Sequence, residues 1–118
     1  MLETMKNVLN NNEKYMKEIE NFLFPGEGVE HIYETVNKFS CVTNKRLLFV
    51  DENTIMKETS IVSIPYSKID IITIPKNYCT CSNNKIRFFA KGRQYELCFL
   101  KEDDTLSFYK VLARHICL

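Results

Sequence analysis

The stretch TNKRLLFVD, residues 43–51, decides the fold class of this 118-residue chain. It opens with a turn, because Asn44 tolerates the positive φ that a two-residue hairpin connection needs. An apolar run of strand length follows, and its successive side chains from Leu47 to Val50 alternate between the two faces of a strand. The pattern predicts one arm of a β-hairpin with apolar layers on both sides.

Outward from this hairpin, short runs rich in Ile, Val, Phe, Tyr and Thr are separated by Asn, Asp, Gly, Lys and Pro, which is typical of consecutive antiparallel strands. A second tight turn stands at residues 91–93, where Gly92 supplies the left-handed residue. Seven strands are predicted, approximately Val29–Thr35, Lys38–Thr43, Arg46–Asp51, Thr59–Ile64, Ile69–Ile74, Lys85–Ala90 and Gln94–Leu100.

Amphipathic helices are predicted on both sides of the strands. Apolar residues recur at helical spacing after the acidic residues 102–104, which suit the positive end of a helix dipole, and predict a C-terminal helix of about three turns. Residues 3–23 predict a helix that is interrupted at residues 10–12. We therefore expect an N-terminal helical extension, residues 1–24, followed by one β domain, residues 25–118.

Composition excludes several classes of protein. A formal net charge of +1 removes the broad positive field of a nucleic-acid-binding protein, so we expect no nucleic-acid partner. The first 24 residues carry seven Lys and Glu side chains between their apolar positions, too many for a secretory signal or a membrane span. The expected location is the cytoplasm.

Two motifs together resemble the bacterial pleckstrin-homology (PH) domain family: residues 43–51, and SIPYSKI at residues 63–69. The resemblance covers roughly residues 26–118. It implies a mainly β fold, a seven-stranded antiparallel bent sandwich or barrel capped by the C-terminal helix, to which this chain adds its N-terminal helix. Both motifs also have a purely structural interpretation, in which Arg46 pairs with a nearby carboxylate such as Asp51 and Tyr66 buries its ring.

The sequence contains few residues or motifs that are typical of catalytic sites. The only histidines are His31 and His115, and neither a Gly-rich phosphate loop nor a recognisable nucleophile setting occurs, so we expect no enzyme activity, cofactor or metal. The five cysteines are an odd number and are expected to be reduced. The pair Cys79 and Cys81 leaves a thiol or metal-binding function as a remote alternative.

Weak binding to anionic lipid or inositol phosphate is the nearer alternative, because eukaryotic relatives of the fold bind such headgroups with clustered basic residues. The candidates here are Lys38, Lys45 and Arg46. A multiply charged headgroup needs several converging donors, so any contact with a membrane surface should be weak. A second basic group, Lys85, Arg87, Lys91 and Arg93, is interpreted as a solvated face.

The favoured hypothesis is a scaffold domain that binds protein through strand edges and helices. The fifth predicted strand is apolar on both faces, and the N-terminal helix needs cover for its apolar stripe, either within the chain or from a partner. The candidate residues are Ile69, Ile71, Thr73, Phe108, Leu112, Met16 and Ile19. The resemblance implies self-association, because bacterial members of the family tend to form symmetric oligomers.

Overall fold

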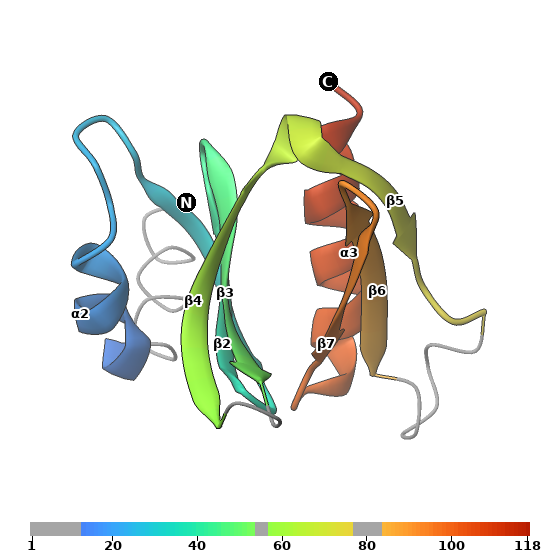
Figure 1. The fold of residues 1–118 in the computed structure, drawn as a ribbon, viewed down its shortest axis with the longest axis horizontal. Coiled ribbons are helices and arrows are strands. Elements are labelled where there is room, and N and C mark those ends of the chain that lie inside the picture. The colour runs from blue at the N-terminus through green and yellow to red at the C-terminus, as the bar shows by residue number, and fades with distance from the viewer. Residues whose placement is uncertain (1–12, 54–56, 77–83) are drawn as a thin grey trace.

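Two antiparallel sheets and a 3-10 turn form the β domain of the computed structural model, which describes residues 13–53, 57–76 and 84–118 (Figure 1). The first sheet has the order β1-β2-β3-β4 and the second β5-β6-β7. Their bounds are β1 Val29–Thr35, β2 Lys38–Thr43, β3 Arg46–Asn53, β4 Glu58–Pro65, β5 Ile69–Thr73, β6 Lys85–Ala90 and β7 Arg93–Cys98, with the 3-10 turn η1, Tyr66–Lys68, between the sheets. All seven predicted strands are confirmed, with bounds shifted by at most two residues.

Helix α3, Glu102–Ile116, closes the space between the two sheets. Its Phe108 and Leu112 are fully buried in an inner core that both sheets line. The ring centroids of Phe99 and Phe108 lie 5.0 Å apart, and Phe49 of the first sheet meets Phe88 of the second edge to face at 5.6 Å. Such aromatic pairs stabilise a core beyond the area that they bury. The predicted helix-capped bent sandwich is therefore the observed fold.

The two sheets are joined at a corner where β1 meets β7. Thr35 and Phe99 form an isolated antiparallel bridge. The N–H of Val36 donates to the carbonyl of Cys98 at 2.9 Å, and the N–H of Leu100 donates to the carbonyl of Glu34 at 3.2 Å. These bonds satisfy backbone groups that would otherwise lie at open sheet edges.

Helix α2, Glu13–Glu20, lies on the outer face of the first sheet (Figure 1). Ile19 is fully buried against Phe39, Leu48 and Val50, so packing within the chain covers the apolar stripe of this helix. The first part of the predicted N-terminal helix, residues 3–12, lies outside the described residues. Neither α2 nor α3 is long and apolar enough to cross a membrane.

The motif network and the candidate interaction surfaces

Arg46 is the centre of a polar network at the β2–β3 turn. Its guanidinium forks onto Glu27, with Nε 2.8 Å from Oε2 and Nη2 2.9 Å from Oε1. It also donates to the hydroxyl of Ser63 at 2.8 Å and to the carbonyl of Phe22 at 2.7 Å. The partner is a carboxylate, as predicted, but it is Glu27 and not Asp51, the residue that we named as an example. Asp51 lies at the far end of β3, about 17 Å away along the strand.

The Glu27 carboxylate is buried, with a side chain that is 0% exposed. Burial alone would raise its pKa, but hydrogen bonds from Arg46, from the Thr43 hydroxyl at 2.8 Å and from the Phe24 N–H at 3.3 Å outweigh burial and lower it. The same pairing raises the pKa of Arg46. The pair is therefore ionised at neutral pH, and it ties the loop before β1 to the hairpin.

The β2–β3 turn does not use the left-handed residue that we predicted. The described residues with positive φ are Lys38, Lys57, Lys91, Gly26 and Gly92, and Asn44 is not among them. Instead, the Thr43 hydroxyl accepts the N–H groups of Lys45 at 3.1 Å and Arg46 at 3.0 Å, which stabilises a turn without positive φ. The Asn44 amide bonds the backbone of Gly28 and Gly26. Positive φ at Gly92 is confirmed.

Tyr66 joins the second motif to the first. Its hydroxyl lies 2.6 Å from the carbonyl of Thr43 and 2.7 Å from that of Arg46. Its ring stacks on His115 with centroids 4.2 Å apart, and the Nε2 of His115 lies 2.7 Å from Glu30. The two motifs therefore lie against each other and against the end of α3, and their polar groups hold the fold together.

Most of the candidate protein-binding residues pack inside the chain. Phe108, Leu112 and Ile69 line the inner core, Ile19 is in the outer core, and Met16 is partly buried against it. Only Ile71, with 53% of its surface exposed, and Thr73 remain accessible. Helical or strand periodicity shows that an apolar stripe of side chains must be buried. It does not show whether the chain's own sheet or a partner protein buries the stripe, because both give the same sequence pattern.

A bulge marks the fifth strand. The pairing of β5 with β6 shifts register between Ile69 and Ile71, so Asp70 has no partner on β6. β5 is an edge strand of its sheet, and the side chains of Asp70, Ile71 and Thr73 are all exposed along it. A bulge interrupts the regular alternation of side chains between the two faces of a strand and changes the direction of the side chain at the bulge.

A sequence comparison decides the family. The family model described as "Bacterial PH domain" matches residues 1–116. This chain belongs to the bacterial PH domain family. Two Bacillus subtilis (strain 168) relatives of this PH domain are named uncharacterized protein YozO, 30% identical over 101 residues, and YjqA, 27% identical over 106 residues. YozO matches 86% of this chain and 89% of its own length, and YjqA 86% and 84%.

Solved structures show the same fold. A pleckstrin homology domain from Shewanella amazonensis SB2B superposes with a TM-score of 0.69 at 24% identity, over 89% of this chain and 97% of that one. A DUF1696 family protein with a pleckstrin-homology domain, from Shewanella loihica PV-4, gives a TM-score of 0.65 at 19% identity, over 88% and 92% of the two chains. At these identities the likeness concerns the fold alone.

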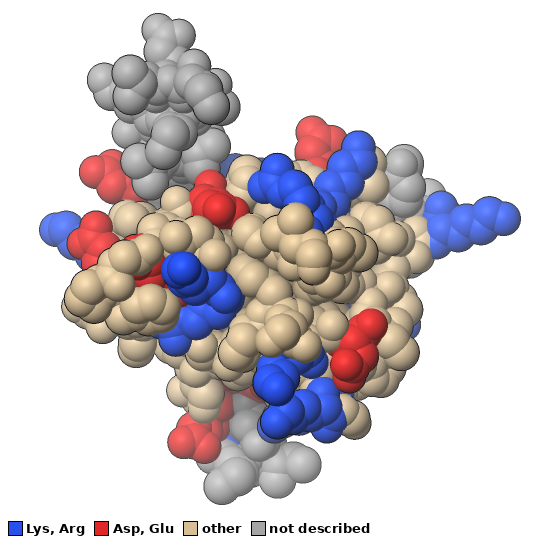
Figure 2. All heavy atoms as spheres, turned by 90° about the horizontal axis from the view of Figure 1, so that it is seen from above, with Lys and Arg blue, Asp and Glu red and all other residues tan. Residues whose placement is uncertain are grey.

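The lipid candidates of this bacterial PH domain do not converge. Lys38 begins β2 and pairs with Glu18 at 3.1 Å, whereas Arg46 follows the other end of that strand and is held by Glu27. Lys45 is exposed. Viewed from above, Lys and Arg side chains form several groups around an uncharged centre, with fewer Asp and Glu (Figure 2).

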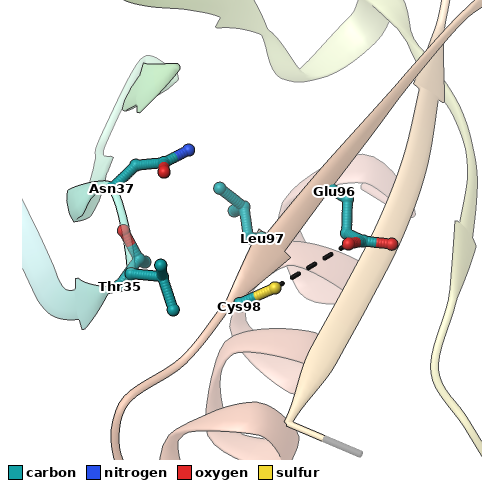
Figure 3. A pocket seen from close by; sticks show the side chains of 6 residues that line it. Thr35, Asn37, Glu96, Leu97 and Cys98 are labelled. Carbon is teal, nitrogen blue, oxygen red and sulfur yellow. Dashed lines mark hydrogen bonds between the residues drawn. The ribbon is translucent and has the colours of Figure 1, made fainter. Parts of the chain in front are cut away.

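A small pocket of about 200 Å³ lies between the β1–β2 turn and β7 (Figure 3). The Cys98 sulfur there is 3.7 Å from the Glu96 carboxylate. Burial raises the pKa of Cys98, and burial raises the pKa of Cys41 to about 12, so neither is a thiolate at neutral pH. The Cys79 and Cys81 pair lies outside the described residues. Within the described part of the chain, no three His, Cys, Asp or Glu side chains are grouped to hold a metal ion.

Proposed function

We propose that this bacterial PH domain is a non-catalytic interaction module that binds a protein segment along the edge of β5. The observation that carries this proposal is Ile71, a large apolar side chain that is half exposed on an edge strand. An edge strand offers backbone N–H and C=O groups to an added strand, and an exposed apolar side chain gives that strand an anchor.

The exposed side chains along β5 indicate what kind of segment would bind there. The side chains of Ile71 and Thr73, two residues apart, lie on the same face of this strand, and Asp70 adds one negative charge beside them. Burying the exposed part of Ile71 under an apolar side chain contributes on the order of 1 kcal/mol. The fitting partner is therefore an extended segment with an apolar residue opposite Ile71 and a cationic residue near Asp70.

The test compares two exposed apolar side chains. Ile71→Lys removes the anchor and places a charge on the edge, whereas Val36→Lys makes the same change at the 66% exposed residue of the β1–β2 turn. Tagged wild-type protein and both variants are used to capture partners from the native host, with quantitative mass spectrometry. We expect a captured protein to be lost with Ile71→Lys alone. Equal capture by all three chains would refute the β5 site.

A second candidate function is weak binding to an anionic membrane, favoured by three exposed cations near the β6–β7 turn. Pairing of Ile69 with Ala90 brings Lys68 near Lys91, and Arg93 follows in the same hairpin. All three cations are exposed. Each contributes about 1 kcal/mol near an anionic surface, so the total is small.

Vesicles of phosphatidylglycerol and phosphatidylcholine test this second candidate. We expect the fraction of protein that sediments with anionic vesicles to fall in the double variant Lys91→Glu with Arg93→Glu. The control is the double variant Lys85→Glu with Lys101→Glu, which changes the net charge by the same amount at two other exposed positions and should sediment like the wild type. Identical sedimentation with and without phosphatidylglycerol would eliminate membrane binding.

A further inference from the structure

The outer face of the first sheet is an apolar surface that crosses all four of its strands. The side chains on this face are Ile32 of β1, Phe39 and Cys41 of β2, Leu48 and Val50 of β3, and Ile61 of β4. An apolar sheet face must be buried against another element of structure. Helix α2 lies on this face, on the side of the sheet away from α3 (Figure 1).

The described part of α2 brings few apolar side chains to this face. Ile19 is its one fully buried residue, and Tyr15 and Met16 are partly buried against the outer core. Val29 and Ile61, which also pack against this core, stay partly exposed. A helix with a wider apolar stripe would therefore bury more of the face than these residues of α2 do.

Two ion pairs set the direction in which α2 lies. The Nζ of Lys14 is 3.0 Å from Oε2 of Glu34, and the Nζ of Lys38 is 3.1 Å from Oε1 of Glu18. Lys14 and Glu18 are four residues apart and lie on the same side of the helix, while Glu34 and Lys38 stand on either side of the β1–β2 turn. A helix with the opposite charge order would bring like charges together, so this hairpin selects one order.

These contacts hold α2 weakly. The side chains of Lys14 and Lys38 are 61% and 56% exposed, and exposed ion pairs add little to stability. The firm bond nearby, from Arg46 to the carbonyl of Phe22 at 2.7 Å, lies beyond the end of α2. The loop that follows α2 can therefore stay anchored while the helix itself moves away, and an element with few buried contacts opens at low cost.

We propose that the outer face of the first sheet is a binding site for an amphipathic helix of a partner protein, which displaces α2 from it. The fitting helix carries a large apolar residue in the place of Ile19, with a basic and an acidic residue four positions apart that meet Glu34 and Lys38. Such a partner gains over α2 by covering Val29 and Ile61 more fully. The site is on a different sheet from β5, so it does not depend on the proposed function.

Fluorescence anisotropy of a labelled peptide tests the proposal on the full chain. The probe has the sequence of residues 13–24, which includes α2. Ile19→Asp removes the buried contact of α2 and opens the site. We expect the peptide to bind this variant at least about tenfold more tightly than the wild type, because the wild type binds only in the fraction of molecules in which α2 is away.

A second opened variant leaves the apolar core unchanged. Lys14→Glu with Glu18→Lys places like charges opposite Glu34 and Lys38, and it should bind the peptide more tightly than the wild type does. The matched control is Glu13→Lys with Lys17→Glu. It exchanges two exposed charges of the same spacing that take no part in these two ion pairs, and it should bind like the wild type.

A second peptide, in which the residues at positions 14 and 18 are exchanged, tests the selection of charge order. We expect it to bind the Ile19→Asp chain at least about threefold more weakly than the first peptide, since like charges then face each other. Adding Glu34→Lys with Lys38→Glu to the Ile19→Asp chain should invert this preference. Ile71→Lys on β5 should leave the binding of both peptides unchanged.

Four results would overturn the proposal. They are a lack of saturable binding to both opened variants at millimolar peptide, equal affinity of the two peptides, equal affinity of the wild type and Ile19→Asp for the first peptide, and a wild-type dimer that Ile19→Asp abolishes. The last result, measured by sedimentation, would assign the outer face to α2 of a second copy. Circular dichroism checks that each variant is folded. If Ile19→Asp is not, the variant Lys14→Glu with Glu18→Lys takes its place in each comparison.

Discussion

The inner and outer faces of the first sheet are each covered by a helix, but by different means. On the inner face, α3 places Phe108 and Leu112 fully inside an aromatic core. On the outer face, α2 has one fully buried side chain, Ile19, and the chain just after it is held by the bond from Arg46 to the Phe22 carbonyl. One sheet thus relies on apolar packing on one side and adds polar anchoring on the other.

Removing a large ring from the inner core should have the largest effect on stability. Phe108→Ala deletes a fully buried ring and leaves a cavity, so we expect the free energy of unfolding to fall by about 4 kcal/mol. Urea unfolding followed by circular dichroism measures this. Tyr109→Ala on the same helix removes a partly buried ring and serves as the control, with a smaller loss. Equal losses would show that the inner core does not dominate.

Breaking the polar anchor comes next. Arg46→Met keeps an apolar stem but leaves the buried Glu27 carboxylate without its cation, which we expect to cost about 3 kcal/mol. Lys45→Met, at the exposed neighbouring position, should stay within about 0.5 kcal/mol of the wild type. The same urea experiment compares them. If both variants unfold alike, the fork is not an anchor.

Truncating the outer contact should loosen α2 selectively. Ile19→Ala removes the fully buried side chain of this helix, at a cost of about 2 kcal/mol in the outer layer. Cys41 is buried in that layer, so its reaction with a thiol reagent under native conditions measures local opening. For each variant, the increase in the labelling rate of Cys41 is compared with the loss in the free energy of unfolding. We expect this increase, for a given loss of stability, to be larger in Ile19→Ala than in Phe108→Ala. Cys117, which is exposed, is the internal reference.

Acid should weaken the anchor with a definite sign. The pKa of Glu27 is lower in the folded protein than its ordinary value of about 4.3, so its contribution to stability is present above that pH and is lost as the pH falls through the folded pKa. We expect Glu27→Gln to be destabilised at pH 7 by about 1–2 kcal/mol, with the difference from the wild type shrinking towards pH 3. Thermal melts over this range, with Glu20→Gln as the exposed control, measure it. A constant difference would contradict the assignment.

Local patterns predicted the fold well because the strands follow one another as hairpins. Alternation from Leu47 to Val50 correctly predicted two apolar layers, which the structure divides between the inner and outer cores. The partner of Arg46 was missed, because Glu27 is distant in sequence while Asp51 is close. The turn at Asn44 was also misjudged, since Thr43 supplies the bonds that make positive φ unnecessary.

Candidate surfaces were harder to predict than elements. Ile19, Phe108 and Leu112 were predicted as protein-binding residues, and the structure buries all three within the chain. The open edge of β4 has no signal of its own in the sequence, because a strand becomes an edge only through the order of the whole sheet. The sequence shows that residues Thr59 to Pro65 carry no charge. That observation indicates an open edge only once the strand order places this segment at the edge of the sheet.

The bridge between Thr35 and Phe99 is the long-range strand contact of the domain, and it bears on the order in which we expect the domain to assemble. Among the described residues, the other strand pairings join strands that follow one another in the chain, so each sheet is built from contacts of low sequence separation. The bridge closes a loop that includes most of the β domain, and chain entropy opposes such closure until other contacts reward it. We therefore expect the two meanders to form first, and the joining of β1 to β7 and the docking of α3 to follow.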